Sequence, residues 1–364
     1  MSRRVGYPIL VALTCLVGCR DQAAKSSSER SSSQTASKAK TKVTEHRVLD
    51  VPQDRIFVAG RGVEVIDAAA GQAVGGLDWK TEISQLRFTQ NGLRAFAASS
   101  SGVFEFDPHK LELRQVFTNS EGVSIRLAPN DDKLFILEAP SNSKQGSETK
   151  SMMKLKVFDL ANSSLTETYQ LPKDVIDFIP AHQSMKFSIF RFDDGRIALA
   201  ENFSLSTFRI VPELKSRSTL FSSPETSLVH FLENAKNSPL VEFDGKNGKW
   251  KRVFSQEGLE FSNLSVTNDG QQLLLSGSVS NLILQYPGYE VSQVLKRALG
   301  QAPVAFSLDR RRLYYLQLDD EQKSYVNVLL LDKEKFQGRI PTESMTARII
   351  EVHPRSEYAA FQVP

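Results

Sequence analysis

The sequence predicts an all-β fold assembled from one repeated four-stranded unit. Two recurring features support this prediction. In the first, an apolar residue closes a short strand just before a polar turn, and another apolar strand follows. The closing residues are Phe88, Leu127, Phe178, Phe231, Val266, Phe306 and Val352. In the second, a strand ends at a residue, most often aspartate, that starts the next turn. Short strands repeating with a period of about 40 to 45 residues are typical of β-propeller blades.

The chain begins with a segment that has the three parts of a secretory signal. Arg3 and Arg4 form a charged start, and the apolar stretch from Pro8 to Val17 is too short to cross a bilayer, which needs about 20 residues. The stretch runs into Leu16-Val17-Gly18-Cys19, which resembles the bacterial lipobox. The resemblance implies that residues 1–18 are removed as a signal peptide and that Cys19 is acylated. The alternative is an ordinary signal peptide with a cysteine near its cleavage site.

Residues 19–45 are predicted to form a disordered tether behind the lipidated cysteine. No aromatic or large aliphatic residue occurs between Arg20 and Lys42, and serine dominates the stretch. A segment of this composition cannot bury enough apolar surface to order itself. Its expected reach is a few tens of Å, from roughly 5–6 Å times the square root of the residue number.

Residues 46–364 are predicted to form one β-propeller domain. The strand-ending positions are Asp67, Asp107, Asp159, Val211, Asp244, Pro287 and Asp332. Asn268-Asp269-Gly270 and Leu308-Asp309-Arg310 are turns that lead into apolar strands, the second being Leu313-Tyr314-Tyr315-Leu316. In this respect the domain resembles the YVTN-type propeller repeat of bacterial envelope proteins, in which an Asp-Gly turn leads into a Lys-Arg-Leu-Tyr-Val-like strand.

The repeat count predicts seven four-stranded blades, closed by N- and C-terminal strands that share a blade. Arg348 to Val352 and Tyr358 to Val363 resemble the first two strands of a blade, with Ile56 to Val58 and Val63 to Ile66 as their partners. Leu49 to Phe57 also resembles a degenerate first strand and turn, which leaves eight blades as the alternative. A half-blade without a partner would leave strand edges unpaired.

The sequence contains no recognised metal, cofactor or catalytic motif. The five histidines share no metal-ligand spacing, and phosphate-binding glycine loops, Gly-x-Ser-x-Gly elbows and Cys-x-x-Cys pairs are absent. We therefore predict no cofactor and no metal, and the sequence favours a non-enzymatic role. Without Arg3 and Arg4, 43 of the 45 Lys and Arg remain and nearly balance the 42 Asp and Glu, so nucleic acid is not a predicted partner.

One set of polar residues is predicted to surround the central channel. Each precedes a closing residue, and strand alternation places it on the opposite face. The polar members are Arg87, Arg126, Asp177, His230, Ser265 and Glu351, with Ala305 as the apolar seventh. Such a ring could bind a small anionic or sugar-like ligand through its arginines. It could instead use His230 or Glu351 as a base, or be a mutually neutralising salt-bridge ring.

These features predict a lipid-anchored propeller of the bacterial cell envelope that binds other envelope proteins as a scaffold. Arg20 after the acylated cysteine favours the outer membrane over the inner membrane. The alternatives are a lactonase-like hydrolase, to which YVTN-type propellers are similar, and a sensor that binds a small ligand in the channel.

Overall fold

The structure of the 364-residue chain is a computed structural model. It describes residues 54–355, with gaps at 80, 119, 121, 141–151, 183, 223–225, 268, 297–298, 300–301, 322 and 343–346. All described residues belong to one compact unit, His46–Pro364. The predicted signal peptide, Cys19, the tether and the strand at 358–363 lie outside the described residues.

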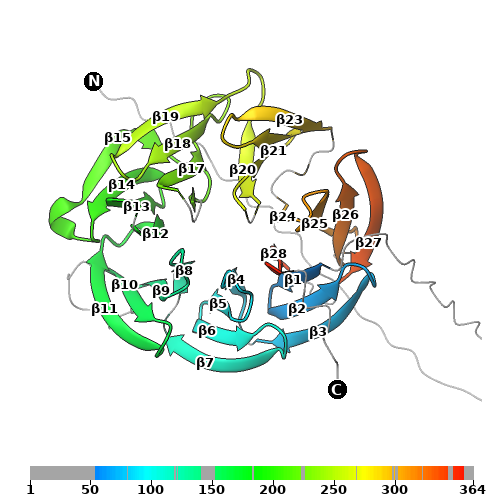
Figure 1. Cartoon of the computed structure of the whole chain (residues 1–364), viewed down its shortest axis with the longest axis horizontal. Coiled ribbons are helices and arrows are strands. Elements are labelled where there is room, and N and C mark those ends of the chain that lie inside the picture. The colour runs from blue at the N-terminus through cyan, green and yellow to red at the C-terminus, as the bar shows by residue number, and fades with distance from the viewer. Residues whose placement is uncertain are drawn as a thin grey trace, which may run out of the picture. The chain divides into compact units, whose positions relative to one another are not determined.

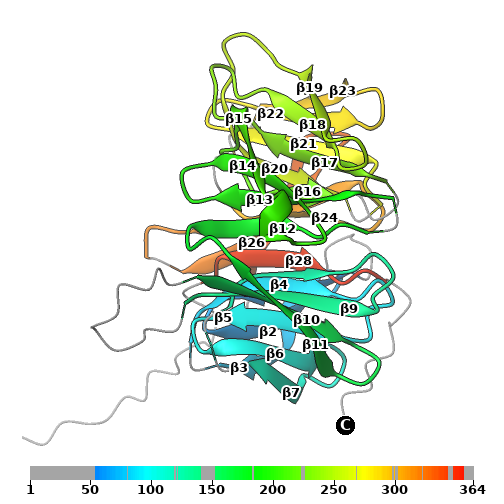
Figure 2. The same ribbon diagram turned by 90° about the vertical axis from the view of Figure 1, so that its left-hand side faces the viewer.

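Seven four-stranded antiparallel sheets form a ring of blades (Figure 1), which confirms the predicted propeller and its seven blades. Figure 2 shows the ring from the side, with strands of blades 3 and 4 toward the viewer.

Blade 1 contains β28 (Ile349–Val352), β1 (Arg55–Ala59), β2 (Gly62–Asp67) and β3 (Gln72–Asp78). Blade 2 contains β4 (Ile83–Phe88), β5 (Ala95–Ser99), β6 (Gly102–Asp107) and β7 (Glu112–Thr118). Blade 3 contains β8 (Gly122–Leu127), β9 (Lys133–Glu138), β10 (Met153–Asp159) and β11 (Ser164–Leu171).

The remaining four blades follow in chain order, each written from the centre of the ring outward. Blade 4 contains β12 (Val175–Ile179), β13 (Phe187–Phe192), β14 (Arg196–Glu201) and β15 (Arg209–Lys215), with the short 3-10 helix η1 (Leu205–Thr207) before β15. Blade 5 contains β16 (Phe221–Ser222), β17 (Leu228–Leu232), β18 (Leu240–Asp244) and β19 (Lys249–Phe254). Blade 6 contains β20 (Phe261–Val266), β21 (Gln272–Gly277), β22 (Asn281–Gln285) and β23 (Glu290–Leu295). Blade 7 contains β24 (Val304–Phe306), β25 (Arg312–Leu318), β26 (Ser324–Leu330) and β27 (Lys335–Pro341).

The hydrophobic core is divided into seven layers, and each layer lies between two neighbouring blades. A blade therefore buries both of its faces, and its two middle strands consist mostly of buried residues. In blade 2, every residue of β5 and β6 is buried, whereas the outermost strand β7 is mostly exposed. This arrangement explains why the sequence shows apolar runs in the middle strands rather than strict alternation.

Two kinds of turn connect the strands, and both match the recurring sequence features. After β4, Thr89 Oγ1 donates to Asn91 Oδ1, and Gly92 follows with a φ of 68°. The same turn recurs after β20 and β24, where Gly270 and Arg310 adopt positive φ. After the third strand, aspartate accepts backbone N–H bonds from the turn, as Asp107 does from His109 and Lys110.

Three of the predicted strand-ending positions are misplaced. Val211 lies within β15, the fourth strand of blade 4, because β14 ends at Glu201 and η1 follows it. Pro287 and Asp332 each come two residues after a strand end, which is Gln285 for β22 and Leu330 for β26. The copies with Val211 and Pro287 lack the aspartate that identifies this turn elsewhere in the chain.

The ring closes through the C-terminal strand β28, which is the innermost strand of blade 1. It pairs antiparallel with β1, with Val58 opposite Ile350, as predicted for terminal strands that share a blade. His353 follows β28. Its Nε2 lies 2.9 Å from the carbonyl oxygen of Gly92 in blade 2. A Cβ added to Gly92 would lie 2.3 Å from Cε1 of His353, so only glycine fits this contact. The eight-bladed alternative does not hold, because β1 is the second strand of a complete blade.

Candidate functional site

Four of the six predicted ring residues form one charged arc. Arg87, Arg126, Asp177 and Glu351 lie on the innermost strands β4, β8, β12 and β28, which belong to blades 1 to 4 (Figure 1). These blades are consecutive around the ring. The prediction that these side chains face a common axis is consistent with their mutual electrostatic interaction, because Arg87 interacts with Arg126, Glu351 and Asp177. Whether this arc binds a ligand stays a prediction.

Asp177 and Arg126 form the buried half of the arc. Nη2 of Arg126 lies 2.7 Å from Oδ1 of Asp177, and their side chains are 13% and 3% exposed. Arg126 also donates to the carbonyl oxygens of Phe178 and Leu220. Asp177 accepts the N–H of Leu220 and the hydroxyl of Ser124. Burial alone would raise the pKa of Asp177, but Arg126 and the Leu220 N–H hold this pKa below its usual value.

Arg87 and Glu351 form the half of the arc that solvent reaches. Nη1 of Arg87 lies 3.2 Å from Oε1 of Glu351, and the two side chains are 32% and 36% exposed. Burial raises the pKa of Glu351, although Arg87 opposes the shift. The pKa of Arg87 is lowered, first by burial and then by repulsion from Arg126. Both side chains are surrounded by protein yet still touch water, as expected in a narrow channel.

The other ring positions carry no charge. Ser265 is half-buried on β20 of blade 6, and Ala305 is buried on β24 of blade 7. Both lie on innermost strands, as predicted. Among the described residues of the innermost strands, charged side chains therefore occur only in blades 1 to 4.

The predicted position of His230 is wrong. His230 lies on β17, the second strand of blade 5, because the two-residue strand β16 is the innermost one. Phe231, its neighbour, packs in the layer between blades 4 and 5. A two-residue strand is too short to show any alternation, so the sequence does not distinguish β17 from the first strand of the blade.

His230 instead belongs to a buried polar network between blades 5 and 6. Its Nε2 lies 2.7 Å from the hydroxyl of Tyr289, and this hydroxyl donates to Glu242. Lys251 pairs with the other oxygen of Glu242 at 2.8 Å. Burial lowers the pKa of His230 to about 4, with Glu242 opposing the shift. His230 is therefore neutral at physiological pH and acts as a structural hydrogen-bonding group.

This network predicts a specific acid sensitivity. Histidine titrates near 6.5 in an unfolded chain, so between pH 6.5 and 4 the unfolded state takes up a proton that the folded state does not. The free energy of unfolding should therefore fall with decreasing pH, by about 3 kcal/mol in total over that window. Urea unfolding at pH 7 and pH 4.5 measures this loss. It should be much smaller in His230→Gln, whereas the half-buried control variant His182→Gln should retain most of it. An equal loss in His230→Gln and the unmodified chain would contradict the assignment.

Sequence reasoning missed Arg191, which adds a third guanidinium to the arc. It lies on β13 directly opposite Asp177 in the strand pairing. Its Nε is buried and has no hydrogen-bond partner in the described part of the chain. Burial lowers the pKa of Arg191, while Asp177 opposes the shift. The available signal was a single charge between two aromatic residues, Phe190 and Phe192, in an otherwise buried strand.

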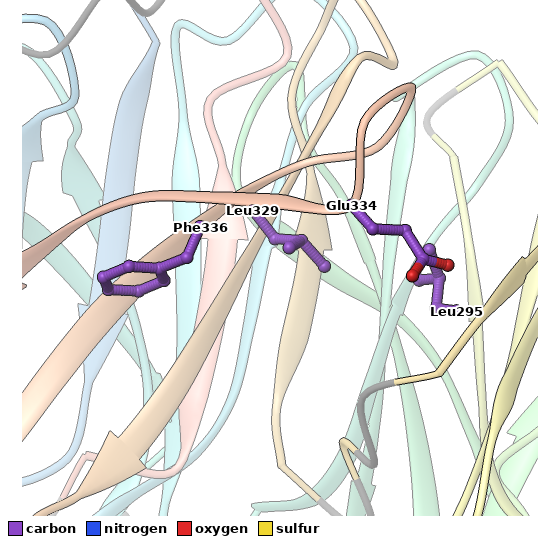
Figure 3. Close-up of a pocket in the computed structure, with 4 residues that line it drawn as sticks. All are labelled: Leu295, Leu329, Glu334 and Phe336. Carbon is purple, nitrogen blue, oxygen red and sulfur yellow. The ribbon is translucent and has the colours of Figure 1, made fainter.

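A separate pocket of about 200 Å³ lies between blades 6 and 7 (Figure 3). It is lined by Leu295 at the end of β23 and by Leu329, Glu334 and Phe336 of blade 7. Sites for drug-sized ligands are usually about 300–1,000 Å³, so this pocket is smaller than a typical ligand site.

Within the described ranges, no group of three or more His, Cys, Asp or Glu residues could hold a metal ion. None of the helices in that part of the chain has the length and apolar character needed to span a membrane.

The chain is similar in fold to many solved structures. No family model and no curated protein sequence matches it. A functionally unknown protein from Desulfotomaculum acetoxidans superposes with a TM-score of 0.61 at 11% identity, covering 83% of this chain and 100% of that one. TolB from Acinetobacter baumannii superposes with a TM-score of 0.51 at 14% identity, covering 82% and 66%. The β-propeller domain of Myceliophteria thermophila Cps50 (Swd1) gives 0.56 at 10%, covering 74% and 90%.

These likenesses, together with the seven blades, define the protein as a seven-bladed β-propeller. At such low sequence identities, these structural likenesses show the fold alone. The YVTN-type repeat and the lipoprotein character stay predictions from the sequence.

Proposed function

We propose that this protein is a lipid-anchored β-propeller that binds other proteins of the bacterial cell envelope. One observation carries the proposal: the lipobox-like Leu16-Val17-Gly18-Cys19 is followed by a serine-rich polar segment and then by a propeller. Acylation at Cys19 would hold the chain on a membrane, because each buried CH₂ contributes about 0.8 kcal/mol and several chains make the attachment stable. Acylation would also leave the mature chain without a free thiol, since the only other cysteine, Cys15, lies within the predicted signal peptide.

The exposed surface of the propeller is suited to contacts with other proteins. The outermost strands carry apolar side chains that are 38% to 50% exposed, and their outer edges are unpaired within the blades. These residues are Val74, Leu113, Val116, Leu165, Ile210, Val291, Val294 and Phe336. In protein interfaces such residues contribute the buried apolar area, and an open strand edge can add a strand from a partner. The propeller body supports these surfaces with buried layers on both faces of each blade.

Cross-linking in intact cells followed by purification from detergent-solubilised envelopes tests the proposal. The expected result is one stoichiometric protein partner that remains bound through size-exclusion chromatography. In Cys19→Ser the chain should leave the membrane fraction, and the yield of cross-linked partner should fall with it. A chain that is recovered without any protein partner from both the membrane and the soluble fractions would contradict the scaffold role.

A further inference from the structure

The hydrophobic layer between blades 6 and 7 is open at its outer end. In two other layers, an aromatic side chain on or next to an outermost strand is packed there. Trp79, which follows β3, stacks on Phe104 with ring centroids 3.6 Å apart. Phe117 of β7 packs on Phe158 with ring centroids 5.0 Å apart. Between blades 6 and 7, by contrast, Phe336 of β27 is 42% exposed and lines the pocket of about 200 Å³.

Three apolar side chains form the walls of this pocket. Leu295 and Leu329 belong to the buried layer between blades 6 and 7 and are 1% and 3% exposed. Phe336 lies directly opposite Leu329 in the pairing of β26 with β27, so their side chains share the face of blade 7 that is turned toward blade 6. Leu295, at the end of β23, contributes the wall from blade 6. The pocket is therefore an apolar slot between two sheets whose positions are fixed by the packed layer.

Glu334 is the only charged side chain among the described residues that line the pocket. Figure 3 shows Glu334 and Phe336 on either side of Leu329, with the carboxylate directed toward Leu295. This carboxylate makes no ion pair and no hydrogen bond with any described residue. The slot therefore has apolar walls and a negative charge at one end.

The lysines next to Glu334 in the sequence do not line the pocket. Lys335 pairs opposite Leu330, one position along from the pair formed by Leu329 and Phe336. Because successive side chains of a strand point to opposite faces, Lys335 lies on the face turned toward blade 1. Lys333 is exposed in the turn between β26 and β27. The negative charge inside the slot is therefore that of Glu334 alone.

We propose that this pocket binds one arginine side chain of a partner protein. Its volume of about 200 Å³ equals that of about seven water molecules at roughly 30 Å³ each, which suits one long side chain. The aliphatic stem of the arginine lies along Phe336 and Leu329, and the guanidinium pairs with Glu334. A guanidinium matches a carboxylate with two parallel hydrogen bonds, whereas an ammonium does not. The inference rests on the proposed protein-binding role and specifies the residue type by which the partner is held.

Peptide titration of the full-length chain in non-ionic detergent, followed by saturation-transfer NMR, tests the pocket. The probe is the blocked peptide Gly-Ser-Arg-Ser-Gly. Two control peptides replace its arginine by lysine or by citrulline, which is a neutral side chain of nearly the same shape. We expect the arginine peptide to bind with a Kd of about 1 mM, as is reasonable for one side chain. The citrulline peptide should bind about threefold or more weakly, since it has no charge to pair with Glu334, and the lysine peptide should lie between them.

Variants of the pocket separate its charge from its walls. Glu334→Gln should weaken the arginine peptide about threefold to fivefold and remove its advantage over the citrulline peptide. Phe336→Ala should weaken all three peptides about tenfold, because an apolar wall is lost. The matched controls are Glu112→Gln, at an exposed glutamate of β7, and Val279→Ala, at an apolar residue that is 72% exposed, and both should bind as the unmodified chain does. Thermal unfolding shows that each variant is folded.

Cross-linking in intact cells separates this inference from the proposed function. Phe336→Ala should lower the yield of cross-linked partner, whereas Val279→Ala should not. A partner retained equally in both variants would overturn the pocket and leave the scaffold role standing. Binding of the arginine peptide without any partner in cells would support the pocket and contradict the scaffold role. The pocket is also overturned if the arginine peptide does not bind below about 10 mM, or binds no more tightly than the citrulline peptide.

Discussion

Replacing Ile350 by aspartate is expected to lower the free energy of unfolding by about 4 kcal/mol or more. Ile350 is 4% exposed on β28 and packs with Ile56 and Val58 of β1 in the layer between blades 7 and 1. A carboxylate there would be buried without a cationic partner and would disrupt the strand that closes the ring. Because closure joins the last blade to the first, its loss should also reduce the cooperativity of unfolding.

Urea unfolding followed by tryptophan fluorescence measures this effect. Val279→Asp is the matched control, since Val279 is an apolar residue that is 72% exposed in a turn of blade 6. That control should shift the free energy by less than about 0.5 kcal/mol. If Ile350→Asp were no more damaging than Val279→Asp, β28 would not be the strand that closes the ring.

Replacing Asp177 by alanine is expected to destabilise the protein by about 3–5 kcal/mol. The change leaves Arg126 buried without its ion pair and leaves the N–H of Leu220 without its acceptor. Asp177→Asn keeps part of the hydrogen bonding and should be less damaging. The double variant Arg126→Met/Asp177→Leu should be more stable than Asp177→Ala, because no uncompensated charge remains buried.

Asp194→Ala is the control for this series. Asp194 also pairs with an arginine, Arg196, at 2.6 Å, but the pair lies at the surface. Its loss should change stability little, because exposed ion pairs are screened by water. A loss of stability in Asp177→Ala that only equals the loss in Asp194→Ala would show that the channel pair is not a buried structural contact.

The sequence predicted the architecture because the propeller is repetitive. Each blade repeats the same local requirements, such as the aspartate turn after β6 that Asp107 forms. A strand end that is misplaced in one copy does not change the period set by the other copies. The number of blades therefore stays correct although Val211 is misplaced. The closing strand was also predictable, since the segment around Ile350 is apolar and has no other blade to complete.

The site was less predictable, because it depends on contacts between blades. Arg87, Arg126, Asp177 and Glu351 could be placed on innermost strands from their spacing alone. Arg191 could not, because it reaches the arc from a second strand through its pairing opposite Asp177. His230 was misplaced for the opposite reason, since β16 contributes only two residues to blade 5. Short strands and cross-strand neighbours leave little periodic signal in a single sequence.

The most direct test of the proposed role is the intact mass of the N-terminal peptide of the protein isolated from bacterial envelopes. The account predicts that the mature chain begins at Cys19 and carries acyl groups on its thiol and its amino group. An unmodified Cys19, or a mature chain that begins after this residue, would contradict the membrane-anchored propeller proposed here.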